Sequence, residues 1–231
     1  MITRALLILS CILISCGDST LPTGTTVSDL SGSQEAMFRR GSEQFNRVFT
    51  VEEGLGPIFN EQSCSGCHPQ NGRGPSGTYL VRFSRAGDPI LNEGGPQLQS
   101  SFIPGVSPEA LPPGVETSIR LGPQILGVGL IEAIPVSTIE ALADPDDLDG
   151  NGISGRVNYV NLPEFVTNVE RGSTGQAIGR FGWKAAVPSL VQQVVTAFHQ
   201  DMGITTVFIP EESRIPRWQT LRLWTRRRIP K

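Results

Sequence analysis

Three residues able to hold a metal cofactor lie within five positions of the chain. Cys64, Cys67 and His68 form the sequence C-x-x-C-H. This is the attachment signature of a c-type haem, because two thiols about one helical turn apart can meet the two vinyl groups while the next imidazole reaches the iron. The spacing predicts one covalent haem with His68 as the proximal ligand.

Two other chemistries use closely spaced cysteines. A structural zinc site has four ligands, usually in two pairs, and the sequence has no second Cys or His pair. A thioredoxin-like dithiol lies at a strand-to-helix junction of a βαβ unit, whereas the loop-like sequence HPQNGRGP follows Cys67. Haem is therefore favoured over both.

The residues that could bind the sixth position of the iron are few. Apart from His68, the soft or imidazole donors of the mature chain are Met37, Met202 and His199. If one of them binds the iron, we expect an electron carrier. If none does, the open position can bind peroxide or a small gas.

The N-terminus has the features of an export signal. Arg4 precedes an apolar run over residues 5–14 that is too short to span a bilayer. Residues 13–16, LISC, resemble the lipobox of bacterial lipoproteins, so residues 1–15 are predicted to be removed and Cys16 to carry lipid. An ordinary secretory signal with an incidental cysteine is the alternative. We expect a lipoprotein on the periplasmic side of a bacterial membrane.

Composition divides the remaining chain into three parts. Residues 16–34, rich in Ser, Thr and Gly, are predicted to be a flexible tether. Residues 35–210 are predicted to form the haem domain, and their acidic balance argues against nucleic acid as a partner. Residues 211–231 carry seven Arg or Lys and two Glu. A basic tail can contact anionic lipid or an acidic partner, but a shifted reading frame or a truncated gene is the simpler expectation.

Periodicity predicts helices that would position the motif. Residues 34–50 have apolar side chains at helical spacing, and Ser31 with Gln34 could form a capping box. Residues 188–203 form the best amphipathic pattern, with Gly203 suited to the C-terminal cap.

The other elements are expected to be short. Ser137 and Glu140 resemble a capping box that opens a helix through Ala143, residues 78–83 suit a strand, and residues 92–124 suit a long ordered loop. With 26 Gly and 18 Pro, the chain is predicted to be a mainly α, loop-rich, cytochrome c-like haem domain with a few short strands.

A second candidate metal site lies in the sequence DPDDLDGNGISG, residues 144–155. Asp147, Asp149 and Asn151, followed by Gly152, match the first half of a calcium loop. Asn158 stands where the loop's bidentate Glu belongs, which argues against an EF-hand. A Ca²⁺-stiffened loop and an acidic turn held by Asx hydrogen bonds remain equal alternatives.

Four blocks of sequence resemble one family in the same order: GLGPIFNEQSCSGCHPQNGRGP, GPQILGVGLIEAIP, ALADPDDLDGNGISGR and IGRFGWKAAVPSLVQQVVTAFHQDMGIT. They resemble di-haem oxidoreductases related to bacterial di-haem cytochrome c peroxidases, over residues 35–209. The resemblance implies peroxide chemistry at an N-terminal haem, electrons from a C-terminal haem, Trp183 between the haems, and Gln193 and Asp201 at the peroxide pocket. Trp183 as a core aromatic and Asp201 as a solvated helix-end carboxylate are the alternatives.

The chain departs from this family at two points. It has no second C-x-x-C-H, and the spacing of Gln193 and Asp201 is shorter than in the peroxidases, with Asp in place of Glu. We therefore expect a redox partner protein or a separate haem domain to supply electrons. A mono-haem electron carrier and a non-functional truncated remnant are the other two interpretations.

Overall fold

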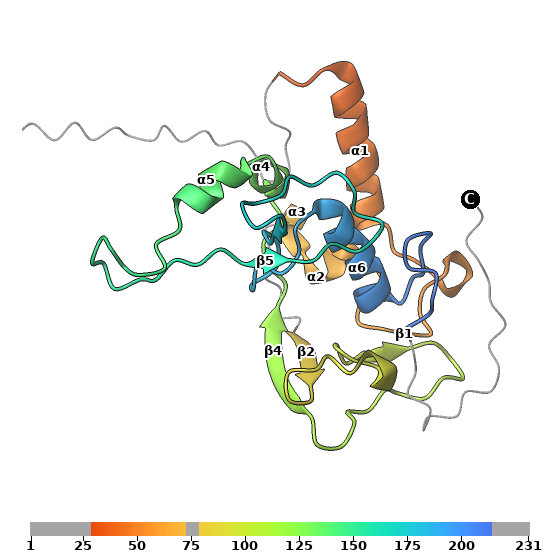
Figure 1. Ribbon diagram of the computed structural model, residues 1–231. Helices are drawn as coiled ribbons and strands as arrows, with labels where there is room; N and C mark the ends of the chain where they lie inside the picture. The colour runs from red at the N-terminus through yellow and green to blue at the C-terminus, as the bar shows by residue number, and fades with distance from the viewer. Residues whose placement is uncertain (1–28, 73–78, 214–231) are drawn as a thin grey trace, which may run out of the picture.

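The computed structural model describes residues 29–72 and 79–213 (Figure 1). The predicted signal peptide, Cys16, most of the tether and most of the basic tail lie outside these residues. Within the described ranges, no helix combines the length and apolar character needed to cross a membrane.

The described elements are mostly short. The helices are α1 (Gly32–Asn46), α2 (Cys64–Cys67), α3 (Pro69–Gly72), α4 (Val128–Glu132), α5 (Val136–Ala141) and α6 (Leu190–Met202), with 3₁₀ turns η1 (Val51–Glu53) and η2 (Leu91–Glu93). The strands are β1 (Ile58–Phe59), β2 (Tyr79–Ser84), β3 (Ser101–Phe102), β4 (Glu116–Leu121), β5 (Tyr159–Val160) and β6 (Ala177–Ile178).

The predicted mainly α fold is wrong. Helices make up 29% and strands 16% of the structure, which is nevertheless loop-rich as expected. The strands form three two-stranded antiparallel sheets, β1–β3, β2–β4 and β5–β6. Glycine and proline are so frequent that few segments can continue a helix for more than two turns.

The two long predicted helices are present. In α1, Ser31 and Gln34 form the expected capping box, although the helix ends at Asn46, four residues before the predicted end. In α6 the Ser189 side chain caps the first turn, and Gly203 adopts a left-handed conformation at the C-cap. A Cβ at Gly203 would lie 2.6 Å from the Ile58 carbonyl oxygen, so only glycine permits this close approach.

The segment predicted as a loop over residues 92–124 contains strand structure. β4 lies within it and pairs along its whole length with β2, the predicted strand. Four of its six residues are Thr, Ile, Arg or Leu, and its pairing partner is far away in sequence. The prediction of a continuous loop is therefore wrong, because a partner supplied by tertiary structure outweighed the flanking Gly and Pro.

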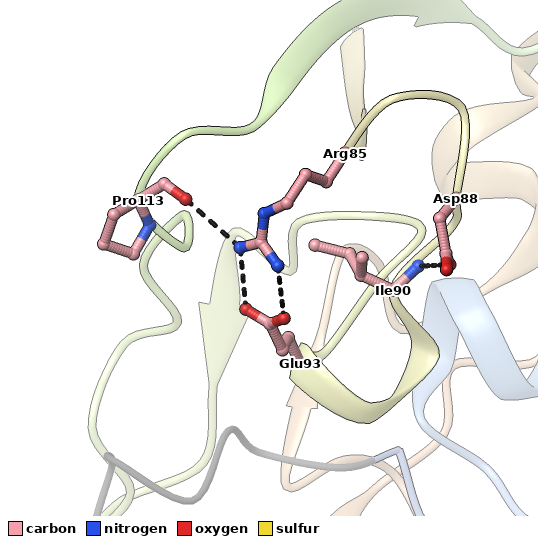
Figure 2. Close-up of polar contacts among 5 residues, drawn as sticks. All are labelled: Arg85, Asp88, Ile90, Glu93 and Pro113. Atoms are coloured by element: carbon pink, nitrogen blue, oxygen red, sulfur yellow. Dashed lines mark hydrogen bonds and ion pairs between the residues drawn. The ribbon is translucent and has the colours of Figure 1, made fainter.

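The chain reversal after β2 is held by side-chain contacts (Figure 2). Arg85 forms a two-pronged ion pair with Glu93, with nitrogen–oxygen distances of 2.5 and 2.9 Å, and also donates to the Pro113 carbonyl at 3.2 Å. The Asp88 carboxylate accepts from the backbone N–H of Ile90 at 2.7 Å. These contacts return the chain after η2 alongside β2.

The hydrophobic core joins the C-terminal end of α6 to the segment before α2. Its buried members are Phe49, Leu55, Ile58, Phe59, Ile103, Val106, Met202 and Ile204. Cys64 and Phe198 pack against this cluster, and the Phe198 ring meets the Phe49 ring edge-on at 5.7 Å. The core therefore fixes the base of the C-x-x-C-H turn to α6, which lies in the middle of the molecule (Figure 1).

The capping box predicted at Ser137 is wrong, although a short helix is present. α5 begins at Val136, so Ser137 lies inside it, and the N–H of Val136 donates to the carboxylate of the distant Glu170 at 2.9 Å. Glu140 instead accepts from the Tyr159 hydroxyl at 2.8 Å and from the Ser173 N–H at 2.7 Å. The carboxylate thus stabilises a distant loop in place of the helix start.

Candidate haem-binding site

The C-x-x-C-H motif forms a single helical turn. The Ser63 hydroxyl accepts from the Gly66 N–H at 3.1 Å, which caps α2. The His68 N–H donates to the Cys64 carbonyl at 2.9 Å and closes the turn. Because residues three apart lie on one side of a helix, the two thiols project from the same side, and His68 leaves the turn directly after them.

Both cysteines are half-buried, and neither forms a disulfide within the described residues. Burial raises the pKa of Cys67 to about 12, and the charges of Asp201, Glu61 and Cys64 contribute. Burial and then Asp201 also raise the pKa of Cys64. A redox dithiol needs a lowered thiol pKa so that a thiolate can attack. The environment of this turn therefore opposes the thioredoxin-like alternative.

His68 is a half-buried imidazole held against a neighbouring loop. Burial lowers its pKa, and the Pro123 carbonyl partly opposes that effect. Its Nδ1 atom is buried and makes no hydrogen bond of good geometry within the described residues. A Cβ on Gly122 would lie 3.0 Å from the ring carbon Cε1, and the Phe45 ring of α1 lies 6.5 Å from the imidazole ring.

This donor set fits a c-type haem. The two cysteines are reduced within the described residues and lie on one helical turn, as thioether formation to two vinyl groups requires. The neutral imidazole has an orphaned buried nitrogen near the Pro123 carbonyl, and a metal-binding histidine typically donates its second ring N–H to such a carbonyl. The chemistry of the residues therefore agrees with the prediction from the motif.

Asp201 lies at the end of α6 and faces the same turn. Its carbonyl oxygen accepts from the Asn60 and Glu61 N–H groups at 2.7 and 3.2 Å. Its side chain accepts from Gln97 Nε2 at 2.6 Å. Burial raises the pKa of the carboxyl, while Gln97 and the charge of Arg82 act in the opposite direction. The structure thus brings Asp201 together with the cysteines.

Trp183 and Gln193 are placed elsewhere. Trp183 is 67% exposed, and its indole N–H donates to the Leu121 carbonyl at 2.7 Å. Gln193 is a half-buried residue in the first turn of α6. Because a helix rises 1.5 Å per residue, Gln193 and Asp201 are separated by about 12 Å along α6. The structure therefore does not bring the three resemblance-based residues into one cluster.

The three candidate sixth ligands have different environments. Met202 is buried in the core at 3% exposure, and Met37 is 67% exposed on α1. His199 Nε2 lies 3.0 Å from the Glu211 carbonyl oxygen. Burial lowers the pKa of His199, so its imidazole tends toward the neutral form.

The acidic loop brings a third carboxylate, that of Asp144, close to the two aspartates that were predicted as calcium ligands. Carboxylate oxygens of Asp144, Asp147 and Asp149 lie within 4.8 Å of one another, whereas the Asn151 amide N–H donates to Asp149 at 2.8 Å. Asp144 accepts from the Leu148 N–H at 2.8 Å. Backbone N–H groups therefore already occupy several of these oxygens.

Sequence reasoning missed the residues that surround the motif. Gln97, Gly122 and Pro123 contact Asp201 or His68, but they lie in residues 92–124, which were predicted as a long ordered loop. The sequence GPQ occurs twice, at residues 95–97 and 122–124, and both copies line this region. That repetition is the one signal in the sequence that could have pointed to them.

Comparison with known proteins gives one match. A family model described as "Di-haem oxidoreductase, putative peroxidase" matches residues 96–218, which is more than half of the chain and begins after His68. No curated protein and no solved structure matches the chain. The match supports oxidoreductase as the kind of activity and haem as the cofactor. The chain belongs to the di-haem oxidoreductase, putative peroxidase, family.

Proposed function

We propose that the protein is an exported c-type haem oxidoreductase, with one haem attached to Cys64 and Cys67 and His68 as its proximal ligand. The observation that carries this proposal is the single capped turn that holds two reduced cysteines, followed directly by a half-buried imidazole whose Nδ1 atom is buried. Family membership supplies the class of cofactor and reaction.

Attachment needs no oxidant or reductant. Each thiol adds its sulfur to one vinyl carbon and its hydrogen to the other, so one S–H bond and one carbon–carbon π bond are replaced by a C–S and a C–H bond. Cys64 and Cys67 suit this addition because they lie one turn apart on α2 and neither is held in a disulfide within the described residues. Ser63 holds the turn in place by capping it.

A bound haem supplies one-electron transfer and, where one coordination position is open, the reduction of peroxide. The Met202 side chain packs in the hydrophobic core, and His199 Nε2 lies within hydrogen-bond distance of the Glu211 carbonyl oxygen. Because neither side chain is available as a ligand, an open coordination position is favoured over a six-coordinate electron carrier. Reduction of peroxide to two waters consumes two electrons and two protons. We propose that a redox partner protein or a separate haem domain supplies the electrons and that Asp201 exchanges protons.

The experiment is an absorption spectrum and intact mass of the chain expressed with a c-type haem maturation system. We expect a c-type spectrum and the added mass of one haem, both lost in Cys64→Ala/Cys67→Ala. A high-spin oxidised spectrum would support peroxide reduction, and a low-spin spectrum would support the electron carrier. A wild-type chain that matures without added mass would contradict the proposal.

Two further parts of the proposal concern regions outside this site. We propose that Cys16 carries lipid and anchors the protein on the periplasmic side of a bacterial membrane, supported by the LISC sequence and the preceding apolar run. Ca²⁺ binding by the acidic loop stays a prediction. It is supported by the cluster Asp144, Asp147 and Asp149 and opposed by the Asx hydrogen bonds that already satisfy it.

A further inference from the structure

The carboxyl group of Asp201 is held by one buried side chain. Gln97 is 3% exposed, and its Nε2 donates to the Asp201 carboxylate at 2.6 Å and to the Gln200 carbonyl at 3.1 Å. A glutamine amide nitrogen carries two hydrogens, so both are used. The short distance to Asp201 is typical of a hydrogen bond to a charged acceptor.

Arg82 determines which way the Gln97 amide points. Its Nη1 lies 3.3 Å from Gln97 Oε1 and 2.9 Å from Gln200 Oε1. Because a guanidinium only donates, the oxygen of Gln97 must face Arg82 and the nitrogen must face Asp201. Arg82 therefore acts on the carboxyl through Gln97 as well as through its charge.

The backbone places Gln97 independently of Asp201. Arg82 and Gln97 form an antiparallel bridge at the edge of β2. Two flanking hydrogen bonds support it, from the Phe83 N–H to the Pro96 carbonyl and from the Leu98 N–H to the Val81 carbonyl, both 2.9 Å. The backbone at Gln97 is thus held at the edge of β2 by contacts that do not involve α6.

We propose that Gln97 is a positioning residue of the haem site: oriented by Arg82, it fixes the Asp201 carboxyl toward the Cys64–Cys67 turn. This inference rests on the proposed function, because the turn is argued to carry the haem. Asp201 is then held beside the cofactor by a residue of a different element, and its protonation responds to the Gln97 hydrogen bond.

Other charged groups face Asp201 or its partners and must be considered with it. The charge of Arg82 on β2 acts to lower the pKa of the Asp201 carboxyl. The charge of Arg120 on β4 in turn acts to lower the pKa of Arg82. The charge of Asp201 raises the pKa of Cys64 and of Cys67 on α2. The charge of Glu61, before α2, also raises the pKa of Cys67. A substitution at position 97 leaves Arg120, Cys64, Cys67 and Glu61 in place but removes or changes one acceptor of Arg82, so the measured shift reports the Gln97 hydrogen bond together with its contact to Arg82.

The test compares the pH dependence of the haem midpoint potential in the full chain between pH 4 and 9. In the wild type we expect an inflection that Asp201→Asn removes and that Glu109→Gln, which removes the other buried carboxyl of this region, leaves in place. In Gln97→Leu the inflection moves about one pH unit higher, a tenfold change in acidity, because one hydrogen bond to the carboxylate is lost. Gln97→Glu preserves the volume and should shift it further, since two carboxyls then share a proton.

Gln99→Leu is the matched control. Gln99 is 7% exposed, donates to the same Gln200 carbonyl at 2.7 Å, and lines the same cavity of about 180 Å³ as Gln97. Its side chain bonds Asn60 and the main chain. We expect this variant to lose comparable stability but to leave the inflection within about 0.3 pH units of the wild type.

Three results would overturn the inference: an inflection unmoved in both Gln97 variants, an equal shift in Gln99→Leu, or a wild-type profile that Asp201→Asn leaves unchanged. A wild-type chain without covalent haem would instead contradict the proposed function. The Gln97 hydrogen bond is then tested in the haem-free chain by ¹³C NMR titration of the Asp201 carboxyl, with the same expected shift in Gln97→Leu.

Discussion

Glu109 should make the stability of this protein fall as the pH rises from about 4.5 to 7. Burial raises the pKa of its carboxyl from the usual 4.5 to about 7, although the Gln99 N–H opposes the shift. That N–H donates to Oε2 at 2.6 Å, while Oε1 is buried without a hydrogen-bond partner in the described part of the chain. The neutral acid is therefore the favoured form in the folded state.

The sign and size of the effect follow from proton linkage. Below pH 4.5 the carboxyl is protonated in both states, and between pH 4.5 and 7 it is ionised only in the unfolded chain. The folded state then binds more protons, so the free energy of unfolding falls by up to about 1.4 kcal/mol per pH unit. Over this window the loss could reach about 3 kcal/mol, and we expect about 2 because water screens a half-buried group.

Glu109→Gln is the variant that tests this. Its side-chain oxygen can still accept from the Gln99 N–H, but it cannot ionise. Urea unfolding of the haem-bearing protein, followed by far-ultraviolet circular dichroism from pH 4 to 8.5, gives the difference between wild type and variant at each pH. Groups common to both proteins cancel in this difference. If the free energies of unfolding of the wild type and of Glu109→Gln differ by the same amount at every pH from 4.5 to 7, the assignment of a raised pKa to Glu109 is refuted.

Further changes test other parts of the structure. Met202→Ala should cost about 2–4 kcal/mol of unfolding free energy in urea titrations, since it leaves a cavity in the core; a loss below 0.5 kcal/mol would contradict the packing. Gly122→Ala should disturb the His68 ring and shift the haem absorption bands, while Gly129→Ala, which meets open space, leaves them unchanged and adds helix propensity. Cys16→Ser should move the protein from the membrane to the soluble fraction on cell fractionation, and continued membrane association would argue against lipidation. Calorimetric titration of the metal-stripped protein with Ca²⁺ should release or absorb heat if the loop at residues 144–152 binds the ion, and no heat would favour the acidic turn.

Local signals in the sequence were sufficient where a feature depends on neighbouring residues. The α1 capping box joins Ser31 to Gln34, and the C-cap of α6 depends on Gly203. Both could be predicted because the interacting groups lie within one helical turn of each other. The capping box predicted at Ser137 is absent because its Glu140 carboxylate bonds Tyr159 and Ser173 instead. These two residues are distant in sequence, so no local pattern reveals them.

The environment of Asp201 shows why the site itself could be predicted only in part. The resemblance indicated Asp201 as a residue of the site, and the structure places it at a half-buried position at the end of α6, where burial raises the pKa of its carboxyl. What fixes the carboxyl is Gln97, 104 positions earlier, oriented by Arg82 on a strand whose partner segment was predicted as a loop. A wrong fold class therefore hides specific chemistry: β2 was predicted as a strand, but the segments that pair with it were taken as a loop, so the amide that bonds the acid has no predicted position. Hydrogen bonds to buried carboxyls are supplied by whichever strand edge the topology brings near, so the sheet pairing must be known before the acid–base behaviour of a helix residue can be assigned.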